Sequence, residues 1–298
     1  MPKIDLAGPA NDVVAWLLDN FGWLFDAIAT VSTDVVGWIE DVLTGPPALV
    51  VIALLTLIPL ALRRWGIAAF AFLAFALIDS MELWTETMQS LAVVLVATVV
   101  AVLVGVPLGI WAARHRLVSI LVRPLLDLMQ TTPPFVYLIP AVFFFGVGVV
   151  PGVVATAVFA LAPAVRLTEL GIRQVDAEVV EAAQAFGAPP RRVLRDVQLP
   201  LALPSIMAGV NQVIMLALSM VVVAGLAGAE GLGAIVTGAV TQLDIGAGFE
   251  GGLAVVILAI YLDRVTGALA APRPRPLRLP WTRGRARSEL PAPVPAGR

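Results

Sequence analysis

The chain consists largely of long apolar runs that are separated by short polar segments. Of its 298 residues, 59% are hydrophobic and only 13% are charged, which is unusual for a soluble globular domain. A helix rises about 1.5 Å per residue, so about 17 to 25 apolar residues cross a hydrocarbon layer roughly 30 Å thick. The sequence therefore predicts an all-α, polytopic membrane protein.

Seven apolar runs are candidates for transmembrane helices. They are residues 47–62, 65–78, 91–113, 135–150, 153–170, 203–226 and 252–270. The first two are short and only Arg63 and Arg64 separate them, which predicts a tight helical hairpin over 46–80 with a basic tip. The boundary between the fourth and fifth runs depends on Pro151 and Gly152 alone.

The arginines predict the orientation of the chain in the membrane. They lie in alternate loops, at 63–64, 114–123, 173–195 and 273–287, whereas the loops at 79–86 and 227–250 contain acids and no Lys or Arg. Basic residues accumulate in cytoplasmic loops. We therefore expect the N-terminus outside, the C-terminus in the cytoplasm, and the polar segment 181–200 at the cytoplasmic surface.

Two terminal segments flank the predicted transmembrane core at 83–270. Residues 1–45 contain Trp and Phe among regularly spaced acids, which predicts an amphipathic helix at the outer membrane interface. A helix packed on the outer face of the bundle explains the same pattern equally well. Residues 271–298 are rich in Pro and Arg and are expected to form a disordered cytoplasmic tail that contacts anionic lipid.

Composition excludes several classes of function. The net charge of −2 and the lack of a basic face within the core argue against a nucleic-acid partner. The chain has no cysteine, and the single histidine, His115, cannot build a zinc site by itself. No phosphate-binding loop of the form GxxxxGK[ST] and no catalytic constellation occurs in the spans. We expect no catalytic residue, no metal and no cofactor.

The polar segment at 181–200, EAAQAFGAPPRRVLRDVQLP, interrupts this apolar sequence. Asp176 is a plausible N-cap, with Glu178 in the first turn, so a helix is predicted to begin there. Gly187 permits a backbone turn that other residues resist. A second helix is predicted from Pro189 or Pro190, with Leu199 and Pro200 closing it. The product is a helix, a bend and a helix that could dock a partner.

The spacing within this segment resembles a known family. The triplet EAA, three residues, Gly187, nine residues, Val197, one residue and then Leu199-Pro200 match the EAA loop of bacterial ABC importer permeases without a gap. The flanking stretches MQTTPPFVYLIPAVFFFGVG, RLTELGIRQV, LPLALPSIMAGVNQVIMLALSMVVVAGLAG and GAEGLG are similar to the permeases for glycine betaine, proline betaine and choline. The similarity extends over roughly 83–268.

The resemblance implies a type I importer fold in the bacterial cytoplasmic membrane. It also implies a second permease copy in a homodimer, two copies of a separate ATPase subunit and an external substrate-binding protein. In that family the EAA loop docks onto the ATPase. The matching positions here are Glu181, Ala182, Ala183, Gly187, Pro189, Arg191, Arg192, Leu199 and Pro200. The arginines among them are equally well explained as topology signals.

Polar groups within the spans are candidates for the translocation path, because such groups tend to face a bundle interior or water. The candidates are Thr131, Thr132, Pro133, Pro134, Tyr137, Asn211 and Gln212. Structural hydrogen bonds and a helix kink explain the same residues. Arg166, Glu169 and Arg173 have the spacing of a local ion pair at the end of the fifth span.

These patterns predict a permease for ATP-driven uptake of quaternary-amine osmoprotectants. An importer of the same class for another small solute is the first alternative. A self-sufficient secondary transporter is less favoured, because no central Asp or Glu is expected in any span.

Overall fold

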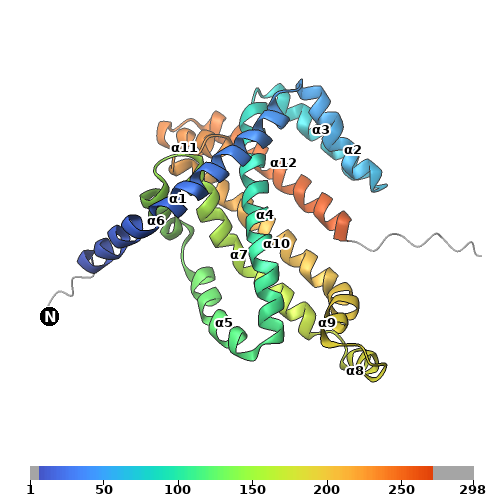
Figure 1. Cartoon of the computed structure of the whole chain (residues 1–298). Helices are drawn as coiled ribbons and strands as arrows, with labels where there is room; N and C mark the ends of the chain where they lie inside the picture. Colours follow the sequence, from blue (N-terminus) through green and yellow to red (C-terminus); the bar gives the residue numbers. More distant parts are fainter. Residues whose placement is uncertain (1–6, 271–298) are drawn as a thin grey trace, which may run out of the picture.

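The computed structural model describes residues 7–270, and this part of the chain is helical throughout, without strands (Figure 1). The predicted tail at 271–298 and the first six residues lie outside the described part. The helices are α1 Ala7–Thr44, α2 Ala48–Ala61, α3 Trp65–Ser80, α4 Trp84–Arg114, α5 Arg116–Thr131, α6 Pro134–Phe145, α7 Val149–Arg173, α8 Ala177–Ala185, α9 Pro190–Arg192, the π-helix η1 Val193–Gln198, α10 Leu199–Leu226, α11 Leu232–Gln242 and α12 Ile245–Ala270.

Helix α7 lies at the centre of the bundle, packed against α4 on one side and α10 on the other (Figure 1). Its contacts depend on small residues. A Cβ placed on Gly109 of α4 would lie 2.6 Å from the Val165 carbonyl oxygen, and one on Gly171 would lie 2.6 Å from Ser205 Cβ of α10. Glycine at these positions therefore lets the helices approach more closely than any other residue would.

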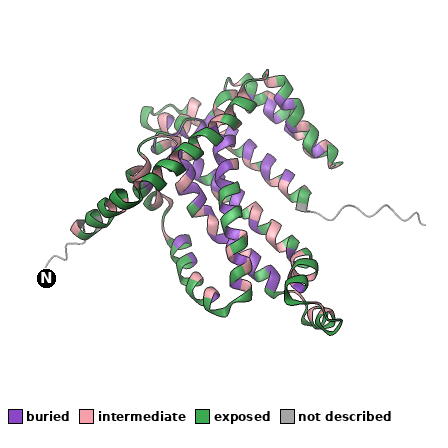
Figure 2. Ribbon diagram, in the orientation of Figure 1, coloured by how far each residue is buried: buried purple, intermediate pink, exposed green. Residues whose placement is uncertain are grey.

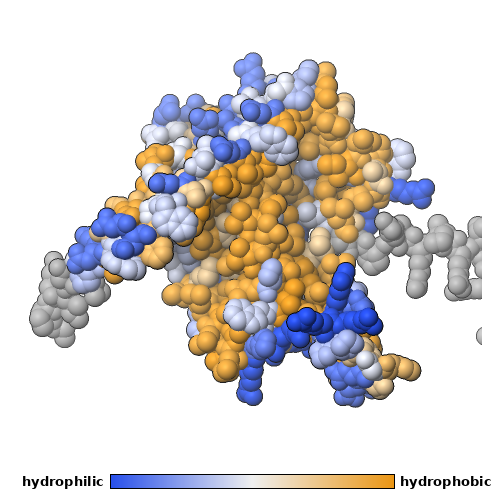
Figure 3. Space-filling view, in the orientation of Figure 1, coloured by the Kyte–Doolittle hydropathy of each residue, from blue (hydrophilic) through white to orange (hydrophobic). Residues whose placement is uncertain are grey.

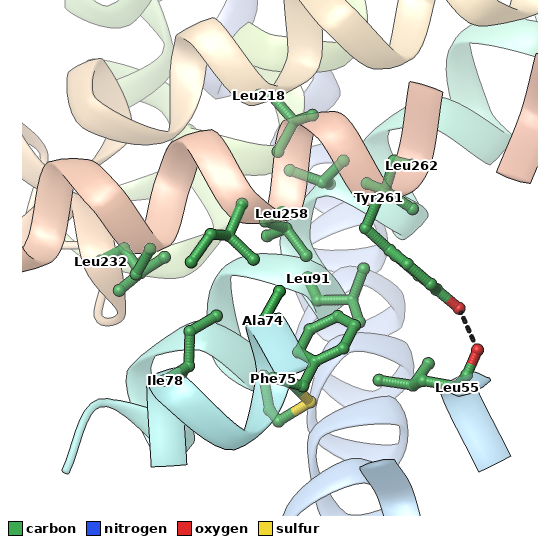
Figure 4. Packing of buried hydrophobic residues seen from close by; sticks show 14 of the residues in the cluster. Leu55, Ala74, Phe75, Ile78, Leu91, Leu218, Leu232, Leu258, Tyr261 and Leu262 are labelled. Atoms are coloured by element: carbon green, nitrogen blue, oxygen red, sulfur yellow. Dashed lines mark hydrogen bonds between the residues drawn. The ribbon is translucent and has the colours of Figure 1, made fainter. Parts of the chain in front are cut away.

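A second group of helices, α2, α3 and α12, packs beside α4 and α10 around the largest buried cluster (Figure 4). Phe75 of α3 is fully buried there, and its ring meets the ring of Tyr261 edge to face at 4.9 Å. The Tyr261 hydroxyl donates to the carbonyl oxygen of Leu55 at 2.8 Å, which gives the buried phenol a partner. Aromatic packing and one hydrogen bond thus attach the hairpin to α12.

Helix α1 is a single helix of 38 residues that crosses the bundle obliquely (Figure 1). Most of it is exposed in Figure 2, and Val36 is its only fully buried hydrophobic side chain among those described. Phe25 stacks on Phe144 of α6 with ring centroids 4.6 Å apart. Trp23 and Trp38 remain mostly exposed. The helix is thus attached at a few points, and its place at the membrane interface stays a prediction.

The helices expected at 91–113, 153–170, 203–226 and 252–270 are observed as α4, α7, α10 and α12, and the two short apolar runs of the expected hairpin form α2 and α3. That this hairpin lies within the membrane stays a prediction. Within the described residues, five helical segments are long and apolar enough to cross a membrane. They are α1, α4, α7, the segment from α9 to α10, and α12. Counting α5 and α6 as one bent span gives six. Figure 3 shows an apolar belt between two more hydrophilic ends of the molecule.

The prediction of a fourth span at 135–150 is wrong. Helix α6 contains only 12 residues and ends at Phe145, because Gly146 and Gly148 turn the chain with φ angles of 77° and 143°. Pro151 and Gly152, expected between two spans, lie in the first turn of α7. The segment before α6, expected as a loop, forms α5, which meets α6 at a bend of 99°.

Candidate functional site

The polar segment folds into a helix and a tight turn. The Asp176 carboxylate accepts a hydrogen bond from the backbone N–H of Glu178 at 2.9 Å, so the expected N-cap of α8 is confirmed. Gly187 has φ of 80°, and the N–H of Ala188 donates to the carbonyl oxygen of Ala183 at 3.1 Å. These features form a glycine-terminated helix end that other residues adopt only with strain.

The second half of the segment does not end where the sequence suggested. Pro189 precedes the first turn of α9, as expected, but Pro200 does not close the helix. Helices α9, η1 and α10 instead form one helical segment from Pro190 to Leu226. Pro200 and Pro204 lack an N–H and clash with the carbonyl four residues earlier. The wider π turn over Val193–Gln198 contains Asp196, whose carbonyl is the one that Pro200 crowds, and it relieves the crowding at that proline.

The loop presents its side chains outward, at the lower end of the molecule in Figure 1. No residue of α8 is buried, and Glu181, Ala182, Arg191 and Arg192 are exposed. Phe186, immediately before the turn glycine, is 92% exposed. Phe186 was not among the docking residues expected from the sequence, although an aromatic residue beside a turn glycine in a polar loop is a candidate for contact with a partner.

A network around one buried carboxylate joins three helices directly behind this loop. Glu169 of α7 is 5% exposed, and its Oε1 lies 2.8 Å from Arg173 Nε, 3.1 Å from Arg123 of α5 and 2.8 Å from the Ser119 hydroxyl, which donates to it. Arg173 also donates to the carbonyl oxygen of Ala112 in α4 at 2.9 Å. The expected Glu169–Arg173 pair is therefore confirmed, and it belongs to a larger network.

Arg166 does not join this pair, although its spacing suggested that it would. It pairs with Asp127 of α5, and both residues line a cavity of about 270 Å³ together with Glu169 and Arg173. The cavity lies between α5 and α7, next to the helix end from which α8 continues.

The residues expected along the translocation path fall into two groups. The first forms the bend between α5 and α6. Thr131 and Thr132 both donate to the carbonyl oxygen of Leu128, and the Tyr137 hydroxyl donates to that of Met129 at 2.7 Å. Pro133 is the N-cap of α6, and Pro134 is its first residue. These contacts satisfy backbone carbonyls at the bend, which is the structural role that the sequence left open.

The second group, Asn211 and Gln212 on α10, is separated by the structure. The Asn211 amide donates to Asp263 of α12 at 2.9 Å and its oxygen accepts from Thr266 at 2.7 Å. Gln212 is exposed on the other face of α10. Asp263 was missed in the sequence, and the expectation that no span contains such an acid is wrong. Within residues 7–270, no cluster of His, Asp and Glu could hold a metal ion.

A family model described as the binding-protein-dependent transport system inner membrane component matches residues 105–271. The match covers the bend, α7, the polar loop, α10 and α12. This chain belongs to that family. It is therefore a transport permease of the inner membrane, and the recognition of an ABC importer permease from the EAA spacing is confirmed.

Curated relatives of the permease are similar over most of its length. It is 49% identical over 270 residues to the glycine betaine transport system permease protein OpuAB of Bacillus subtilis, covering 89% of this chain and 94% of that protein. It is 44% identical to the glycine betaine/proline betaine permease ProW of Escherichia coli, covering 89% and 75% respectively. These relatives are transporter subunits rather than enzymes.

A solved structure shares the fold. An inward-facing form of the MetNI methionine ABC transporter superposes with a TM-score of 0.55 at 21% identity, over 61% of this permease and 91% of that chain. The all-α fold of an ABC transporter permease is therefore confirmed.

The Glu169 network predicts a stability difference between two carboxylates. Replacing Glu169 by Gln leaves two guanidinium groups without their charged partner and is expected to cost about 2 kcal/mol. D127N, which breaks the exposed pair with Arg166, is expected to cost under about 1 kcal/mol. Thermal unfolding of the purified permease measures both. An equal loss in the two variants would contradict a structural role for the Glu169 network.

Proposed function

We propose that this permease is the membrane-spanning subunit of an ATP-driven importer for quaternary-amine osmoprotectants, with glycine betaine, proline betaine and choline as the substrate class. The high identity to relatives named for betaine transport, spread over nearly the whole chain, supports this substrate class. The permease provides the path through the membrane, and a separate subunit supplies the energy.

The proposed assembly contains a second copy of the permease, two ATPase subunits on the cytoplasmic side and a substrate-binding protein outside. The dependence on a binding protein in the family's description supports the last of these. The lack of a phosphate-binding loop in the sequence supports a separate ATPase. In this assembly the N-terminus is outside and the segment 181–200 faces the ATPase.

The observation that carries the proposal is the geometry of the segment 181–200. Its first helix, α8, has no buried residue and ends at an exposed aromatic side chain, Phe186. Small side chains at Ala182 and Ala183 allow another surface to approach closely. Its second helix continues without a break into α10. A partner that moves α8 and α9 would therefore also move a helix of the bundle.

A secondary transporter is the alternative that one observation favours, since Asp263 is an acid within α12. Asn211 holds this carboxylate in a hydrogen bond between α10 and α12, which is how a polar pair joins two membrane helices. We therefore assign Asp263 a structural role, and an ATP requirement for uptake distinguishes the two functions.

Coupling through α8 predicts that Phe186→Asp prevents binding of the ATPase. The side chain is solvent-exposed in the permease alone, so the variant is expected to fold normally, while burial of an unpaired carboxylate opposes docking. Copurification of the ATPase subunit is expected to fall at least tenfold, for a penalty above about 1.4 kcal/mol. Leu243→Asp, with an 86% exposed side chain at the α11 end of the molecule, is the matched control. Normal copurification with F186D would contradict docking at this loop.

The substrate class predicts the uptake profile of proteoliposomes containing the permease with its ATPase and binding protein. Radiolabelled glycine betaine should accumulate only with ATP inside, and excess unlabelled proline betaine or choline should compete. Methionine should not compete. Accumulation driven by an ion gradient without the ATPase would contradict the assignment as a subunit of an ATP-driven importer. If only unrelated solutes competed with glycine betaine, the proposed substrate class would be wrong.

The predicted orientation determines from which side of the membrane a reagent can label each polar end of the permease. The chain has no cysteine, so single cysteines can be introduced without a background. E181C is expected to react with a membrane-impermeant maleimide in inside-out vesicles and not in intact spheroplasts. E250C, at the start of α12, should show the reverse pattern. Labelling of E181C from outside would contradict both the topology and the coupling role.

A further inference from the structure

A cavity of about 490 Å³ lies between the hairpin and α12, away from the polar segment at 181–200. Its lining consists of Arg64, Gly66, Ile67, Phe70, Ile260 and Arg264. A smaller cavity adjoins it and shares Arg64, Ile67 and Arg264. The walls combine apolar side chains from α3 and α12 with two guanidinium groups, one at the hairpin tip and one on α12.

Neither arginine has a partner for its charge within the described part of the chain. Arg64 and Arg264 both have exposed side chains, and no hydrogen bond or ion pair joins either guanidinium group to another described residue. In contrast, Arg123 and Arg173 are paired with Glu169, and Arg166 is paired with Asp127. Asp263 lines the smaller cavity, but its Oδ1 accepts from Asn211.

The surroundings of the two arginines are those expected at the level of lipid headgroups. Trp65, next to Arg64, is 74% exposed, and exposed tryptophans concentrate at membrane interfaces. The neighbouring surface of α3 is apolar, with Leu73 and Phe72 exposed. Figure 3 shows this apolar surface ending in a hydrophilic patch at the hairpin tip. The apolar wall of the cavity fits acyl chains, and the two unpaired arginines fit the charged headgroup of the same lipid molecule.

We propose that this cavity binds the phosphate-bearing headgroup of an anionic phospholipid, with Arg64 and Arg264 on the phosphate and Ile67, Phe70 and Ile260 on the acyl chains. Guanidinium groups match phosphate geometry in paired hydrogen bonds. Basic pockets between membrane helices favour anionic lipids for this reason. The bound lipid would join the hairpin, which contacts the rest of the bundle mainly through α12, to that helix at a second point.

Native mass spectrometry of the full-length permease in neutral detergent tests the proposal, with phosphatidylglycerol and phosphatidylcholine titrated separately. Phosphatidylglycerol is expected to bind more tightly. The double variant R64Q/R264Q should weaken phosphatidylglycerol binding by about 30-fold and phosphatidylcholine binding much less, because the choline cation already offsets the phosphate charge of that lipid. R114Q/R116Q, which removes two exposed arginines from the α4–α5 turn, is the charge-matched control and should change it less than threefold. Equal losses in both double variants would overturn the proposal, because binding would then be non-specific.

A second variant tests the cavity without changing charge. Gly66 lines the cavity, and a Cβ there meets no atom within 4 Å, so a Phe side chain is expected to extend into the cavity. G66F should weaken phosphatidylglycerol binding, whereas G37F, on an equally open glycine of α1, should not. Normal lipid binding by G66F would overturn the site. Displacement of the lipid by millimolar inorganic phosphate would also overturn it, in favour of a free-phosphate site.

Discussion

The close contact of α7 with α4 and α10 is the constraint on which the rest of the structure depends. Lipid tails are as apolar as the helices, so the hydrophobic effect does not press membrane helices together, and packing contacts must hold them. Gly109 and Gly171 bring the backbones close enough for those contacts. The end of α7 is then fixed against Ala112 through Arg173. The polar loop therefore starts from a rigid point of the bundle.

Most of the fold could be predicted because the sequence signals its helices locally. The apolar runs of α4, α10 and α12 are long, and the arginines between α2 and α3 mark a hairpin. Between α5 and α6 the prolines at 133 and 134 signal an interruption, but the residue types do not give the 99° angle between the two helices. The apolar sequence continues through Gly146 and Gly148, so composition alone did not reveal that α6 stops there.

In the candidate site, too, features that depend on neighbouring residues could be predicted, and features that depend on distant residues could not. The N-cap at Asp176 and the turn at Gly187 depend on neighbouring residues and were predicted correctly. The π turn before Pro200 was not predicted, because residue spacing does not show whether a proline ends a helix or lies within one. The partner of Asn211 lies on α12, far along the chain, and one sequence cannot reveal such a pair. The acid itself is visible in the sequence beside Arg264, but its hydrogen bond to α10 is not.

The polar loop and the bundle are connected by two different kinds of joint. Helix α8 follows α7 through the short turn at Gln174–Asp176, where α7 is held by Glu169, Arg173 and α4. Helices α9 and η1 instead continue directly into α10. A force on the loop meets a fixed support on the first side and a continuous helix on the second. Movement should therefore pass preferentially along α10, and through the Asn211–Asp263 bond to α12, rather than along α7.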